Sequence, residues 1–145
     1  MIITEIELQC EDIRWFGIDT NHHVFTCTSA GIANVPTFVC NSKENTLYLE
    51  KFFLSYTHKF SEIKFMKSMN KNSAMYKETI NLTSKGIYCY DAFDLRDRIP
   101  YCKISEPFCP LFFDVLPDEI KEILINNKLD IDVTIDSFIL VENAY

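Results

Sequence analysis

The stretch Ile13-Arg14-Trp15-Phe16-Gly17-Ile18-Asp19, followed closely by Val24-Phe25-Thr26-Cys27-Thr28, decides the fold of this chain. Both runs are rich in aromatic and β-branched residues, which favour strands. Residues 19–22 lie between them, and Asp19 and Asn21 suit a turn because their short side chains bond to nearby backbone groups. The pattern predicts a β-hairpin. Cys27 is expected in the core because it shares a strand face with Phe25.

Helical and strand patterns follow one another after this hairpin. Apolar side chains at three- and four-residue spacings predict helices over 43–57 and 73–84, and a third helix begins at Pro117 and includes Leu129. Strands are expected at 87–91 and 99–104, and the segments 130–134 and 137–141 are expected to form one or two more, whereas 58–72 has no clear pattern. This order predicts an α+β fold with a mainly antiparallel sheet and about three helices packed on one face.

The length and composition predict a single globular domain over 1–145. Hydrophobic side chains make up 48% of the chain, which is enough for one core. The N-terminus lacks the features of a secretory signal, and no run approaches the roughly 18 apolar residues of a membrane span. The six cysteines are scattered and contain no C-x-x-C pair, as expected for free thiols in a reducing compartment. A cytoplasmic protein without a membrane partner is expected.

The formal net charge of −7 is distributed unevenly along the chain. Residues 1–42 carry a net −4, residues 43–85 a net +4, and residues 86–145 a net −7. The last block would repel phosphate backbones and attract a basic partner, and a charge imbalance of this size is also typical of a solvated surface that aids solubility. Lysines between Lys59 and Lys77 interleave with Phe60 and Phe65, but no nucleic-acid recognition module accompanies them. No nucleic-acid partner is therefore expected.

The candidate catalytic and metal-binding residues each have a simpler structural explanation. His22 and His23 are adjacent at a hairpin turn, where their side chains point to opposite faces and cannot readily share an ion. Cys27 lies four residues after His23 but lacks a third group to orient a histidine base. No P-loop, G-x-G-x-x-G or G-x-S-x-G pattern occurs. We expect no catalytic residue, no metal and no cofactor.

Two groups of aspartates are the candidate partner-binding residues. They are Asp91, Asp94 and Asp97 around a charged turn, and Asp130, Asp132 and Asp136 near the C-terminus. Asp130 and Asp132 are expected on one face of a strand, the arrangement that a hard cation or a glycosidase mechanism requires. Neither an EF-hand spacing nor a second catalytic group accompanies them. Exposed carboxylates at a strand edge also prevent unwanted edge pairing, and the hypothesis that the six acids contribute to binding a basic partner depends on the resemblance described next.

Several short motifs occur together along the chain. Ile13-Arg-Trp-Phe-Gly-Ile-Asp19 leads to Thr28-Ser-Ala-Gly31 and Val35-Pro36, and the later half contains Gly86-Ile-Tyr-Cys-Tyr-Asp91 and Leu116-Pro-Asp-Glu-Ile120. These segments resemble a group of small bacterial proteins, and the resemblance covers most of the chain. Some members of that group look like immunity partners of polymorphic toxins. The resemblance implies a protein-binding domain that neutralises a cognate toxin, and it offers no catalytic residues to carry over.

The expected partner is a basic toxin domain. Immunity proteins are often acidic because many of their targets are basic nucleases, and complementary charge speeds capture. A small hydrolase-like enzyme is one alternative, and it would contain a pocket in which a Cys, His or carboxyl group has a strongly shifted pKa. A self-associating structural module is another, and it would expose a large apolar patch, for which the Phe-rich segment 108–113 is the candidate.

Overall fold

The computed structural model describes residues 1–57, 60–66 and 70–142 of the chain. The predicted hairpin is present as β1 (Arg14–Ile18) and β2 (Val24–Thr28), which pair in antiparallel fashion with Ile18 opposite Val24. Every residue of both strands is buried. The hairpin therefore lies in the middle of the molecule, with covering layers on both faces, and Cys27 is a core residue as predicted.

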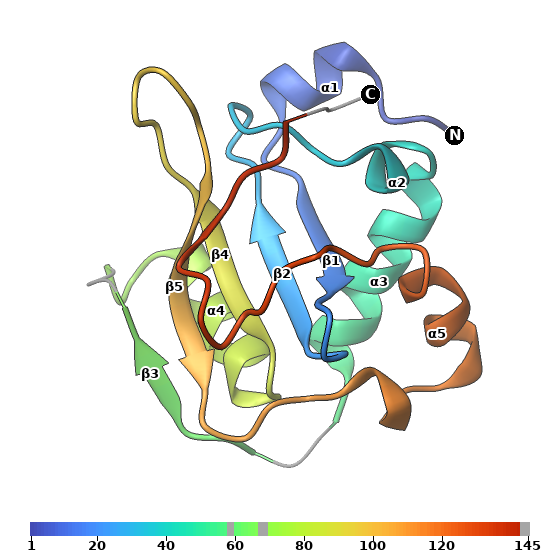
Figure 1. The fold of residues 1–145 in the computed structure, drawn as a ribbon, viewed down its shortest axis with the longest axis vertical. Coiled ribbons are helices and arrows are strands. Elements are labelled where there is room, and N and C mark those ends of the chain that lie inside the picture. Colours follow the sequence, from blue (N-terminus) through green and yellow to red (C-terminus); the bar gives the residue numbers. More distant parts are fainter. Residues whose placement is uncertain (58–59, 67–69, 143–145) are drawn as a thin grey trace.

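All the described strands belong to one sheet, whose order is β1-β2-β4-β5-β3 with β6 also paired to β5 (Figure 1). The remaining strands are β3 (Ile63–Phe65), β4 (Tyr88–Ala92), β5 (Tyr101–Pro107) and β6 (Phe138–Ile139). Among the described pairs, β2 and β4 are parallel and the others are antiparallel. The mainly antiparallel sheet confirms the predicted α+β class.

Three helices pack on one face of the sheet, as predicted. They are α3 (Lys43–Ser55), α4 (Ala74–Ser84) and α5 (Asp118–Leu124). Their apolar side chains form one cluster with the sheet, in which Phe53 of α3 stacks on Phe16 of β1 with ring centroids 4.8 Å apart. Ser42 caps α3 and Ser73 caps α4 by accepting hydrogen bonds from backbone N–H groups of the first turn. The α3 and α4 ribbons lie behind the sheet in Figure 1.

The C-terminal segment, residues 129–141, covers the opposite face of the sheet (red in Figure 1). Val133 and Ile139 pack there in the cluster that contains the fully buried Trp15. The polar atoms of Trp15, Tyr90 and Tyr101 are hydrogen-bonded. Trp15 Nε1 donates to the Tyr101 hydroxyl at 3.1 Å, and the Tyr90 hydroxyl donates to the Asp136 carbonyl at 2.6 Å. The second of these bonds ties the crossing segment to β4.

The predicted strand at 130–134 is wrong, because this segment forms a turn. Asp132 Oδ1 accepts hydrogen bonds from the backbone N–H and the hydroxyl of Thr134, at 2.9 and 2.6 Å. Asp136 Oδ2 accepts from the Asp132 N–H at 2.8 Å. Such local side-chain bonds compete with a strand ladder for backbone groups. The predicted strand at 137–141 is reduced to Phe138–Ile139.

The sequence patterns do not reveal two short helices and one strand. α1 (Glu5–Cys10) begins at a capping box formed by Thr4 and Glu7, α2 spans Thr37–Cys40, and β3 lies within the unassigned segment 58–72. Residues 58–59 and 67–69 of that segment lie outside the described residues. The third predicted helix ends at Leu124 and does not reach Leu129.

No helix in the described part of the chain has the length and apolar character that crossing a membrane requires.

Candidate functional site

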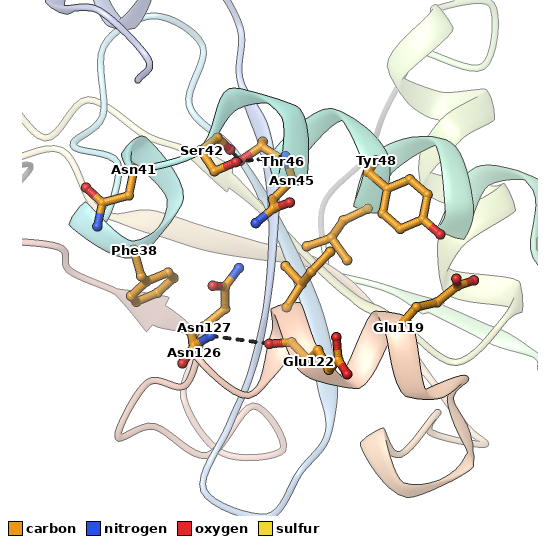
Figure 2. Close-up of a pocket in the computed structure, with 12 residues that line it drawn as sticks. Phe38, Asn41, Ser42, Asn45, Thr46, Tyr48, Glu119, Glu122, Asn126 and Asn127 are labelled. Atoms are coloured by element: carbon orange, nitrogen blue, oxygen red, sulfur yellow. Dashed lines mark hydrogen bonds between the residues drawn. The ribbon is translucent and has the colours of Figure 1, made fainter. Parts of the chain in front are cut away.

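A groove of about 760 Å³ runs between α3 and α5 (Figure 2). We call it the α3–α5 groove. Side chains from α2, α3, α5 and the turn after α5 line it: Phe38, Asn41, Ser42, Asn45, Thr46, Tyr48, Leu49, Glu119, Glu122, Ile123, Asn126 and Asn127. Polar side chains therefore make up most of the lining, including the amides of Asn41, Asn45, Asn126 and Asn127.

The start of α3 fixes one wall of the groove. Ser42 accepts a hydrogen bond from the Asn45 N–H, and the Thr46 hydroxyl donates to the Ser42 carbonyl at 3.1 Å. The Thr46 hydroxyl also lies within hydrogen-bonding reach of the Val39 carbonyl, at 3.3 Å, which joins α3 to the end of α2. Leu49, one turn later, is buried. These contacts hold the Asn45 side chain on the groove side of a rigid helix start.

The second wall is α5 and the turn that follows it. Ile120 and Leu124 are buried in the core, and the helical spacing therefore places Glu119, Glu122 and Ile123 toward the groove. Asn127 Nδ2 donates to the Phe16 carbonyl at 2.9 Å, and the Asn127 carbonyl accepts from the Ile18 N–H at 3.0 Å. The turn after α5 is thus bonded to the outer edge of β1, which fixes the distance between the two walls.

The groove lining is acidic and contains no basic side chain. None of the described lysines, arginines or histidines forms an ion pair with Glu119 or Glu122. Lys121, on the same helix, lies with its ammonium 5.8 Å from the centroid of the Phe113 ring. Two carboxylates therefore face the groove without a neutralising partner in the described part of the chain.

Tyr48 and Glu119 lie toward one end of the groove, and Phe38 and Asn127 lie toward the other (Figure 2). Partial removal from water raises the pKa of Tyr48, and the hydrogen bond with Glu119 raises it further. A neutral Tyr48 hydroxyl can donate to the Glu119 carboxylate at neutral pH. Glu119 therefore interacts with Tyr48 across the groove, whereas Glu122 has no hydrogen-bond partner for its carboxylate among the described side chains.

The six predicted acids occupy two regions of the fold outside the α3–α5 groove. Asp91 on β4 is half-buried and accepts a hydrogen bond from the Thr28 hydroxyl at 2.7 Å. Asp94 accepts from the Arg96 N–H at 2.8 Å within the β4–β5 turn, where the exposed Asp97 stands between two arginines. Charge in this turn is therefore balanced locally.

The C-terminal acids also serve local structure. Asp132 and Asp136 are half-buried and bonded within their own turn, whereas Asp130 is exposed. The expectation that Asp130 and Asp132 share one strand face is wrong, because no strand forms there. The sequence reasoning did not identify Glu119, Glu122 or Asn127 as site residues. The available signal was the i, i+3 spacing of two glutamates on a helix whose buried positions are Ile120 and Leu124.

A cluster of the buried Asp19 and His23 with the half-buried Asp132 joins the β1–β2 turn to the C-terminal segment. One ligand atom from each residue lies within 4.8 Å of the others. Asp19 is fully buried, and its Oδ1 accepts from the Asn21 and His23 N–H groups at 2.9 and 2.8 Å. Its Oδ2 accepts from the Val133 N–H at 3.0 Å and lies 3.0 Å from His23 Nδ1. These bonds use about four acceptor positions of the Asp19 carboxylate. The cluster is therefore explained by its structural role, which is to hold the C-terminal segment against the β1–β2 turn.

The two histidines face different surroundings, as predicted. His23 packs between Tyr88 and Phe112, whereas His22 contacts Phe113 and lies 3.6 Å from Asp114. Burial raises the pKa of Cys27 well above its ordinary value, and burial also raises the pKa of Cys89. A buried thiol that resists ionisation is a poor nucleophile. Neither the histidines nor these cysteines form a catalytic arrangement in the described structure.

Comparisons with protein-family models, with functionally characterised proteins and with solved structures found no match to this chain. The chain is therefore classified here by its fold and its groove alone. It is a small α+β domain with a six-stranded sheet and an acidic, amide-lined groove between two of its helices.

Proposed function

We propose that this chain is a protein-binding domain that captures a basic partner in the α3–α5 groove. The observation that carries the proposal is the lining itself, which combines two carboxylates and four side-chain amides with no basic group. Carboxylates attract and hydrogen-bond cationic side chains, and amides can pair with the peptide groups of a bound segment. Such a lining suits a basic polypeptide better than an acidic or purely apolar ligand.

In biological terms, we propose that the chain is an immunity protein that neutralises a cognate bacterial toxin in the cytoplasm. The net charge of −7 over residues 86–145 supports it, because a long-range negative field speeds encounter with a basic toxin domain. Asp130 is exposed and contributes to that field, whereas Arg96 and Arg98 offset the charges of the exposed Asp94 and Asp97. Asp91, Asp132 and Asp136 contribute less to direct contact, because they are half-buried and bonded within the fold.

Self-association is a second candidate function, and exposed apolar side chains favour it. Phe108 is 63% exposed, Phe112 is 42% exposed, and Val115, just beyond the Phe-rich segment 108–113, is 60% exposed. Sedimentation velocity over a range of protein concentrations tests this candidate. A concentration-dependent dimer that the Phe108→Ser variant abolishes would favour self-association, and a monomer at every concentration would exclude it.

The binding proposal is tested with the purified full-length chain as bait in a lysate of its source cells. Each captured protein is then expressed alone, and its affinity is measured by calorimetry at low and at physiological salt. A basic partner should bind less tightly as salt shortens the Debye length from about 30 Å to about 8 Å. Salt-independent binding, or an acidic partner, would contradict the proposal.

Two double variants with equal change in net charge locate the binding surface. Glu119→Gln/Glu122→Gln neutralises the groove, and Glu5→Gln/Glu62→Gln neutralises two exposed acids outside it. The groove variant should bind the basic partner about tenfold or more weakly, because a hydrogen bond to a charged group contributes about 1.5–3 kcal/mol. Equal losses in both variants would show that net charge, and not the groove, determines affinity.

A further inference from the structure

One acceptor in the α3–α5 groove has no partner, although its residue is almost fully buried. Asn127 is 6% exposed, and its Nδ2 is bonded to the Phe16 carbonyl at 2.9 Å. That bond fixes the rotation of the amide. Its Oδ1 accepts no hydrogen bond from any described residue, yet it is not enclosed, and Asn127 lines the groove. This acceptor is open to the groove and fixed in direction, so it can accept from water in the free protein and from a donor group of a ligand when one binds.

Two further groups line the same groove. Glu122 is exposed on α5, and none of the described cations forms an ion pair with it. Its own backbone carbonyl accepts from Asn126 Nδ2 at 3.2 Å, which ties the turn carrying Asn127 to the helix carrying Glu122. Phe38 is half-buried, and contact with the Trp15 ring at 6.1 Å between centroids holds it in place. Figure 2 shows Phe38 beside Asn127 at this end of the groove.

A fixed neutral acceptor, an unpaired carboxylate and an aromatic ring together match one side chain better than others. A guanidinium group is planar, always charged and carries five N–H donors in a fixed fork, so it can donate to two separate acceptors at once. It also packs against aromatic rings. A lysine ammonium is a compact, strongly hydrated point charge that gains less from such a divided set of acceptors.

We infer that this end of the groove is a receptor for an arginine side chain of the basic partner. The guanidinium donates to Asn127 Oδ1 and to the Glu122 carboxylate, and it packs on Phe38. The inference rests on the proposed function and adds to it the chemical identity of the group that enters the groove. Tyr48 and Glu119, at the other end, contact the polypeptide that carries the arginine.

The test uses the full-length ¹⁵N-labelled chain and two synthetic peptides, acetyl-Gly-Arg-Gly-Arg-Gly-amide and its counterpart with lysine in place of arginine. The arginine peptide should shift the side-chain NH₂ resonances of Asn127 and Asn126 in a saturable way. The lysine peptide should bind about tenfold more weakly, the effect expected when one charge-assisted hydrogen bond is lost. Equal affinity for both peptides would overturn the inference and leave the proposed function standing.

Matched variants distinguish a specific arginine receptor in the groove from a general attraction between the acidic chain and a basic peptide. Glu122→Gln should weaken binding of the arginine peptide about tenfold, whereas Glu62→Gln removes the same charge far from the groove and should leave the affinity unchanged. Phe38→Leu keeps apolar bulk without the ring and should weaken binding about two- to fivefold. The dispersion of the backbone spectrum shows that each variant is folded.

Failure of the inference and failure of the proposed function give different results. If a basic partner protein binds with salt-dependent affinity and Glu122→Gln has no effect on it, the arginine receptor is refuted and the binding function is retained. If neither peptide nor any basic protein binds the wild-type chain, both are refuted.

Discussion

Replacing Asp19 with alanine should destabilise the fold strongly, because this buried carboxylate joins two segments that are distant in sequence. Asp19 is fully buried at the end of β1. Its oxygens accept from the backbone N–H groups of Asn21, His23 and Val133, and the last of these bonds spans 114 residues of sequence. Without the carboxylate, the hairpin turn and the C-terminal segment lose the contact that aligns them.

The size of the effect follows from the donors that remain. In Asp19→Ala the N–H groups of His23 and Val133 stay buried without an acceptor, and each such group costs about 1–3 kcal/mol. Removing the buried charge recovers part of this cost, because the charge no longer has to be desolvated. We expect the free energy of unfolding to fall by about 3 kcal/mol, a large fraction of the 5–15 kcal/mol typical of a domain.

Urea denaturation followed by tryptophan fluorescence measures the change directly. Trp15 is the single tryptophan and is fully buried, so its emission reports unfolding. For an m value of about 2 kcal/mol per M, the midpoint should fall by about 1.5 M urea. Asp130→Ala removes an exposed acid of the same C-terminal segment and should change stability by less than about 0.5 kcal/mol. A loss below about 1 kcal/mol in Asp19→Ala would refute the structural role of this carboxylate.

Two further predictions concern the sheet and its covering loops. Gly86→Ala should lower the free energy of unfolding by at least about 2 kcal/mol, since Gly86 has φ of +101° and an added Cβ would lie 2.4 Å from the Leu111 nitrogen. A thermal unfolding curve that matches wild type would contradict this. Burial raises the pKa of Tyr88 to about 12, with Glu106, Asp19 and Asp132 adding to the rise. The folded state therefore keeps a proton that the unfolded state loses above about pH 10, so stability is fully present below about pH 10 and falls between about pH 10 and 12. Urea midpoints over this pH range should fall less steeply in Tyr88→Phe, and superimposable profiles would count against the assignment.

Local patterns in the sequence predicted the elements whose causes are local. The β1–β2 hairpin follows from two β-rich runs around Asp19 and Asn21, and the starts of α3 and α4 follow from the capping serines Ser42 and Ser73. The short helix α1 was not predicted, although Thr4 and Glu7 have the S/T-x-x-E spacing of a capping box, because no apolar run follows them. Whether one of these segments forms a helix or a strand depends on interactions within a few residues, so the local sequence predicts it.

The C-terminal segment shows where local patterns fail. The alternating residues from Asp130 to Thr134 have the period of a strand, but four of their polar groups bond within the turn, and Val133 is the one side chain among them that is buried. Alternation alone cannot distinguish a strand that pairs with a neighbour from a turn that covers a sheet, because the difference lies in whether an edge is available for pairing.

The sequence by itself determined the α+β class, the hairpin at the start, the three longer helices and the acidic character of the C-terminal half. Only the tertiary structure decided that β4 pairs with β2 in parallel, that Asp19 reaches Val133, and that α5 lies opposite α3. The α3–α5 groove depends on Asn127 bonding to the edge of β1, across 111 residues of sequence. Contacts of this kind depend on how whole elements pack against one another, and no short-range pattern encodes them.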